Sequence, residues 1–141
     1  MSAQDERNLF WHYFDKYLED QGNPFYVTHT KGGINQAAGN INNPSPMAMQ
    51  TICCEFKYLE QVVLVQFYIN HNVPLYDKLY SLKDQIEKKL GFKVEWIDSG
   101  KKSPSVRRIQ KVLPVKNGLY YTVIESFPYI LKFIEVFSPY T

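Results

Sequence analysis

The sequence contains few of the residues from which catalytic and metal-binding sites are usually built. Its two cysteines, Cys53 and Cys54, are adjacent, and its three histidines are scattered singly. Adjacent residues on a strand point to opposite faces, so the two thiols cannot chelate one ion together, and two cysteines make no disulfide framework. Zinc-ligand spacings, the phosphate-binding G-K-[ST] sequence and the G-x-S-x-G elbow are all missing. The sequence therefore predicts no metal and no cofactor, with both thiols reduced.

Long apolar runs and a strong charge of one sign are also missing. No run approaches the roughly 18 residues of a membrane-spanning helix, and the polar, acidic start "MSAQDERNLF" excludes a signal peptide. We therefore expect a cytoplasmic protein with no membrane association. The net charge is only +2 at pH 7, so no whole-molecule field demands a nucleic-acid partner. The 141 residues, 45% of them apolar, predict a single globular domain over 1–141.

Hydrophobic periodicity predicts alternating helices and strands. Apolar residues recur at helical spacing over about 5–20, 74–90 and 118–137, and Pro128 either kinks the last helix or marks its start. Alternation of period two predicts a hairpin of strands 51–57 and 63–70, and two further strands over 92–98 and 105–114. Residues 22–48, rich in Gly, Pro and Asn, predict a long loop or a loose hairpin, with a short strand at "YVTHT".

These elements predict an α+β fold in the order α-β-β-α-β-β-α. We expect an antiparallel sheet of four or five strands, with helices packed mainly on one face. The first helix is expected to lie alongside the other two. The predicted core residues are Phe56, Val65, Phe67, Leu79, Leu82, Ile86, Trp96, Ile130 and Phe133.

Glu55-Phe56-Lys57 has the Glu-x-Lys pattern found on a strand of restriction-type nucleases. A metal-dependent nuclease needs at least two acidic ligands that converge on one Mg²⁺. Residues 21–54 contain no Asp or Glu, and Glu60 falls in the predicted turn. The pattern therefore favours a charged pair on the solvated side of a hairpin. A metal-dependent nuclease-like enzyme using Glu55, Glu60 or Glu95 remains the least favoured alternative, and no catalytic residue is assigned.

A basic segment is the one asymmetry that suggests a partner. Six cations and no acidic residue lie between Ser99 and Ile124. Arg107 and Lys111 share a strand face with Ile109, whereas Arg108 lies on the other face, so the cations cannot all form one patch. The alternative is that these charges solvate a sheet edge and discourage edge-to-edge pairing. The residues that would contact a phosphate backbone are Lys101, Lys102, Arg107, Arg108 and Lys111.

Several short motifs resemble a known family. Ile86-Glu87, Gly91, Trp96, Lys101-Lys102, Arg108-Ile109 and Phe137-Ser138-Pro139, with "FWHYF" near the start, are similar to the bacterial family called domain of unknown function 4268 (DUF4268). The resemblance spans most of the chain but has no counterpart for residues 35–48. It implies an α+β domain of unassigned activity. It also implies an association with longer proteins that carry restriction-type nuclease domains.

Two functions follow as expectations. The first is a non-enzymatic binding or accessory domain linked to nucleic acid or to a protein of a restriction-type nuclease system. The second is a protein-interaction module, for instance a homodimer, that uses an exposed sheet face or the aromatic-rich helices.

Overall fold

A four-stranded antiparallel sheet lies at the centre of the structure, in the strand order β1-β2-β4-β3. The structure is a computed structural model that describes residues 2–25, 27, 50–98 and 104–141. Strands β1 (Gln50–Lys57) and β2 (Val62–Asn70) form the predicted hairpin, and β4 (Val106–Pro114) pairs with the other edge of β2. The short strand β3 (Glu95–Ile97) pairs with residues 108–110 of β4. The predicted strand at 26–30 lies outside the described residues except for Val27.

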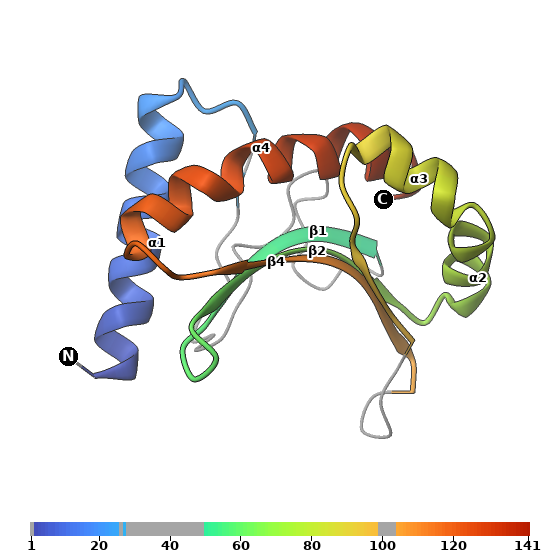
Figure 1. Cartoon of the computed structure of the whole chain (residues 1–141), viewed down its shortest axis with the longest axis horizontal. Helices are drawn as coiled ribbons and strands as arrows, with labels where there is room; N and C mark the ends of the chain where they lie inside the picture. Colours follow the sequence, from blue (N-terminus) through green and yellow to red (C-terminus); the bar gives the residue numbers. More distant parts are fainter. Residues whose placement is uncertain (1, 26, 28–49, 99–103) are drawn as a thin grey trace.

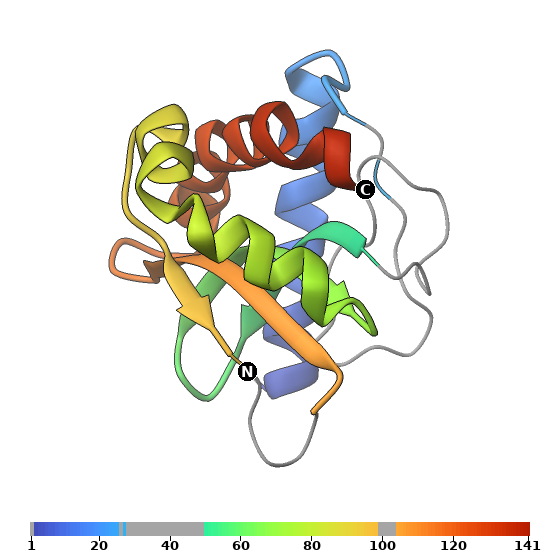
Figure 2. The ribbon, with the colours of Figure 1, turned by 90° about the vertical axis from the view of Figure 1, so that its right-hand side faces the viewer.

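In the described part of the chain, four helices cover one face and the ends of this sheet. They are α1 (Ala3–Asp20), α2 (Val73–Ser81), α3 (Lys83–Leu90) and α4 (Leu119–Phe137), and a 3₁₀ turn η1 (Ser138–Tyr140) follows. In Figure 1, α4 crosses above the sheet, with α1 at one end and α2 and α3 at the other. Figure 2 shows α2 and α3 in front of α4, on the same side of the sheet. The described residues thus have the predicted α+β class and sheet.

Local sequence signals fix the helix ends. Ser2 and Asp5 form a capping box, in which the Asp5 N–H donates to Ser2 Oγ at 3.1 Å. The Leu75 N–H donates to the side chain of Asn72 at 3.2 Å at the start of α2. Gly91 ends α3 with φ 86°, a left-handed conformation that a residue with a Cβ adopts only at a cost. Pro128 lies inside α4, so the alternative in which it starts the helix is wrong.

The predicted helix over 74–90 is wrong in one respect, because it is two helices separated at Leu82. The Leu82 N–H bonds to the Leu79 carbonyl three residues back, which tightens the last turn of α2. The break gives the two halves different packing partners, since α2 contacts β2 and β4 whereas α3 contacts α4. One straight helix could not pack its apolar stripe against the sheet and against α4 at the same time.

The apolar core lies between the sheet and the helices. Phe10 of α1 stacks on Phe56 of β1 with ring centroids 5.3 Å apart, and Phe67 of β2 stacks on Phe137 of α4 at 4.8 Å. Aromatic pairs of this kind add about 0.5–1.5 kcal/mol each beyond the burial of their area. Of the nine predicted core residues, Leu82 and Trp96 are only half-buried. The seven that are buried are Phe56, Val65, Phe67, Leu79, Ile86, Ile130 and Phe133.

Candidate functional site

The three predicted basic residues that the structure describes, Arg107, Arg108 and Lys111, do not form one surface. Lys101 and Lys102 lie outside the described residues. The side chain of Arg107 is only 13% exposed, its Nε lies 2.6 Å from an Asp98 carboxylate oxygen, and its Nη1 donates to the Pro104 carbonyl at 2.7 Å. The Nε contact is an ion pair without the angle of a hydrogen bond, since this Nε has no hydrogen-bond partner among the described residues. Arg107 is therefore occupied in fixing the turn before β4.

Arg108 lies on the sheet face opposite the helices. It pairs across the sheet with Tyr68 and Ile97. Its charge acts on the carboxyl of Glu55 and the thiol of Cys53, which lie on the same face. Arg108 and Lys111 thus belong to opposite surfaces, as the strand alternation predicts.

Lys111 is the one basic residue of β4 on the helix side that makes no ion pair with a described residue. It lies between Ile109 and Leu113 on the apolar face of the strand, opposite Val65. Its Nζ lies 5.3 Å from the ring centroid of Tyr129 on α4 and 5.8 Å from that of Phe92. The alkyl stem of a lysine can lie along apolar residues while its ammonium group reaches the rim, and ring faces attract the cation. The two rings therefore hold this charge in a defined position.

A pocket opens beside Lys111 where β3 and β4 separate. The Val94 N–H, just before β3, donates to the Glu87 carboxylate of α3 at 3.0 Å. The Val94 N–H is thus bonded to α3 and not to β4, and the strand predicted over 92–98 is only Glu95–Ile97 in the structure. Beyond Gln110, β4 therefore has no strand partner on that side among the described residues. The resulting open pocket has a volume of about 250 Å³, and its lining is Lys93, Val94, Glu95, Gln110, Lys111 and Val112.

A second, smaller pocket of about 90 Å³ lies where β4 meets α4. Pro114, Lys116, Tyr121 and Glu125 are among its lining residues. Val112 of the first pocket and Pro114 of the second are two residues apart on β4. On α4, Glu125 and Tyr129 are one helical turn apart and so share a face. The two pockets are therefore neighbours along β4, and Tyr129 beside Lys111 lies one turn of α4 from Glu125 in the second pocket.

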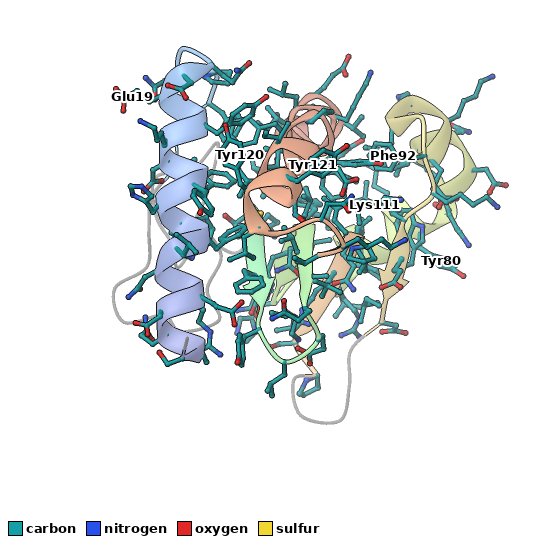
Figure 3. The ribbon with its side chains drawn as sticks, turned by 60° about the vertical axis from the view of Figure 1, so that its left-hand side comes forward. Glu19, Tyr80, Phe92, Lys111, Tyr120 and Tyr121 are labelled. Atoms are coloured by element: carbon teal, nitrogen blue, oxygen red, sulfur yellow. The ribbon has the colours of Figure 1, made fainter. Side chains whose placement is uncertain are left out.

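Together these residues define one surface, which we call the Lys111 surface. Figure 3 shows Tyr121, Lys111 and Phe92 along the side of the molecule that faces the viewer. Its cations are three lysines, and Glu95 and Glu125 at its margins leave it with a small positive balance. The members of the Lys111 surface are Phe92, Lys93, Lys111, Lys116, Tyr121 and Tyr129.

Sequence reasoning found Lys111 but missed its companions. Phe92 lies in the connection between α3 and β3, whereas Tyr121 and Tyr129 lie on α4, so no short motif contains them. One signal was present: Lys111 interrupts the apolar positions Ile109 and Leu113 of β4. A lysine whose side chain points toward the core has to extend its ammonium group to the edge of that core, so it is expected to lie among apolar side chains.

The Glu55-x-Lys57 pattern lies on the face of the sheet opposite the helices, where Glu55 pairs across the sheet with Leu64. Glu55 accepts a hydrogen bond from Gln66 Nε2 at 3.1 Å, and burial raises the pKa of its carboxyl against the opposing effect of Lys57. The raised pKa shows that this environment stabilises the charged carboxylate less well than water does, and the charged form is the one that Mg²⁺ would need. In the part of the chain that the structure describes, no three His, Cys, Asp or Glu residues gather closely enough to hold a metal ion.

Both cysteines are free and buried. Cys54 belongs to the apolar core, and Cys53 lies on the opposite face, as the alternation predicts. Burial raises the pKa of the Cys53 thiol to about 12, and the charge of Glu55 adds to this effect. A nucleophilic cysteine needs a lowered pKa, so Cys53 has the properties of a packing residue.

The fold and the surface define an α+β domain with a mixed aromatic and basic surface on its helix-covered side. The chain matches the family described as Domain of unknown function (DUF4268) over residues 6–140, and it belongs to that family. No curated protein and no solved structure matches it. Within the described residues, no helix combines the length and the apolar character needed to span a membrane.

Proposed function

We propose that this chain is a non-enzymatic accessory domain that binds nucleic acid through the Lys111 surface. The observation that carries the proposal is the Lys111 ammonium group, held by the rings of Phe92 and Tyr129 without an acidic partner among the described residues. A fixed cation with unused N–H donors is suited to a phosphate oxygen, because little side-chain freedom is lost when the contact forms.

Neighbouring residues support the same interpretation. Lys93 is exposed in the pocket that Lys111 also lines, and Lys116 is exposed in the second pocket, so three positive charges border this part of the molecule. Contacts of this kind bind the phosphate backbone without regard to sequence. The family resemblance, which implies association with restriction-type nuclease proteins, also suits a domain that holds nucleic acid while another protein performs the reaction.

The test is a fluorescence anisotropy titration of a labelled oligonucleotide at low salt with the wild-type chain and two charge-reversal variants. Lys111→Glu is expected to weaken binding by about tenfold, because it removes one phosphate contact and adds repulsion. Lys16→Glu makes the same charge change at an exposed position of α1 and is expected to retain wild-type affinity. No binding by the wild-type chain, or equal losses in the two variants, would reject the proposal.

A self-associating domain remains a second candidate because α4 exposes large apolar side chains. Tyr120, Tyr121 and Leu131 are 48%, 55% and 45% exposed. Light scattering at high micromolar concentration tests this function. A monomer mass would exclude a homodimer, whereas a dimer mass that Leu131→Glu converts to monomer would support it.

A further inference from the structure

The charge of the Lys111 surface is too small for a phosphate-only interface. The two pockets are lined by three lysines and by Glu95 and Glu125, so the local excess is one positive charge. Duplex DNA presents its phosphates outward and its bases stacked inward, and proteins that bind it without sequence preference depend on many basic contacts. Additional affinity at this surface has to come from contacts that are not ionic.

The aromatic residues of the Lys111 surface supply such contacts. Tyr121 is 55% exposed, and no ring or cation of the described residues covers its ring. The other exposed tyrosines differ in this respect. Tyr120 packs on Tyr13 at 5.4 Å, and Tyr80 packs on Trp96 at 5.7 Å. Tyr121 is thus an uncovered aromatic ring that borders a pocket containing Lys116.

Phe92 and Tyr129 form a second aromatic group one pocket away. Their rings meet edge to face with centroids 4.8 Å apart, and both are half-buried beside the Lys111 ammonium group. Tyr121 and Tyr129 lie two helical turns apart on α4, a separation of about 12 Å along the helix axis. Two aromatic groups, each next to a lysine, therefore line one side of the surface.

We propose that the Lys111 surface selects single-stranded nucleic acid, with an unpaired base stacked on Tyr121 and the backbone phosphates held by Lys93, Lys111 and Lys116. This inference rests on the proposed function and specifies its ligand. Interleaved aromatic rings and cations are typical of sites for single strands, because every base has a flat face to stack while the charges follow the backbone. A duplex offers the same phosphates but keeps its bases out of reach of Tyr121.

The experiment compares oligo-dT with a DNA hairpin that has the same number of phosphates, both labelled and titrated at low salt. The wild-type chain is expected to bind oligo-dT at least about fivefold more tightly than the hairpin. Tyr121→Ala is expected to weaken oligo-dT binding by about five- to a hundredfold, the range for the loss of one stacked base, and to leave hairpin binding unchanged. Tyr121→Phe keeps the ring and is expected to retain wild-type affinity.

Tyr80→Ala, at a tyrosine that is 50% exposed on α2 outside the Lys111 surface, is the matched control and is expected to bind normally. Equal wild-type affinity for oligo-dT and hairpin would overturn single-strand selection and leave the proposed function standing. Equal losses of oligo-dT affinity in Tyr121→Ala and Tyr80→Ala would likewise overturn single-strand selection and leave the proposed function standing. No binding of either DNA would overturn both proposals.

Discussion

The salt dependence of binding gives a quantitative test of the charge assignment. Each phosphate that a protein neutralises on a single strand contributes about 0.7 to the slope of log affinity against log salt. The structure supplies three lysines for this role, Lys93, Lys111 and Lys116. The expected slope is therefore about −2.1, so a fourfold rise in salt, from about 50 mM to about 200 mM, weakens oligo-dT binding by about eighteenfold.

Lys111→Met is the most informative change for this test. Methionine preserves much of the unbranched side chain and packs well against the rings of Phe92 and Tyr129, whereas the charge is lost. With two lysines left, the slope should fall to about −1.4 and the same rise in salt should weaken binding by about sevenfold. The assay is an anisotropy titration at four salt concentrations, accompanied by a melting curve to verify folding.

Lys16→Met on α1 serves as the control, because it removes the same charge from a helix that contributes no residue to the Lys111 surface. Its slope should equal that of the wild-type chain. A wild-type slope retained by Lys111→Met, or lowered as much by Lys16→Met, would refute the assignment of phosphate contacts to this surface.

Three further predictions concern the fold. Phe67→Ala removes a fully buried ring that stacks on Phe137 at 4.8 Å, and it should lower the free energy of unfolding by about 3–5 kcal/mol in urea titrations; a loss below about 1 kcal/mol would contradict the packing. Glu55→Gln removes a carboxyl whose pKa is raised by burial. The variant should therefore be more stable than the wild-type chain by an amount that grows as pH rises above 4.5 and vanishes well below it. A difference in melting temperature that does not depend on pH would contradict this. Cys53 should resist a thiol reagent at pH 8 in the native protein and react fully in guanidinium chloride, because its pKa is about 12, whereas fast native labelling would show an exposed thiolate.

The sign of the Glu55 effect follows from the direction of its shift. A carboxyl with a raised pKa binds its proton more tightly in the folded chain than in the unfolded chain. The contribution of Glu55 to folding stability is therefore fully present at low pH. It is lost as the pH rises from the ordinary pKa of 4.5 through the raised pKa. Glutamine cannot ionise, and its amide oxygen can still accept the hydrogen bond from Gln66.

The periodicity of apolar residues predicted most of the helices and strands. Alternating apolar residues located the hairpin to within one residue at the ends of β1 and β2, and the apolar spacing located α1 and α4 to within two. These signals are local and strong because one face of each element is buried. The break at Leu82 was missed because the apolar stripe continues through it, and only the different packing partners of α2 and α3 require it.

The candidate site was only partly predictable for a physical reason. The basic segment identified Lys111 and also Arg107, but sequence gave no indication that Asp98 would occupy Arg107. The aromatic neighbours of Lys111 are 19 residues before it and 18 after it in the chain. Their meeting depends on how α3 and α4 pack over β4, which no spacing rule contains.

Photo-crosslinking tests the central claim most directly. Oligo-dT with iodinated uracil substitutions would be crosslinked to the wild-type chain at low salt, and tryptic peptides would be identified by mass spectrometry. The Lys111 surface predicts crosslinks in peptides 90–93 and 117–132, which contain Phe92, Tyr121 and Tyr129. Crosslinks confined to α1 or to the face of the sheet that carries Arg108, or none at saturating protein, would contradict the account.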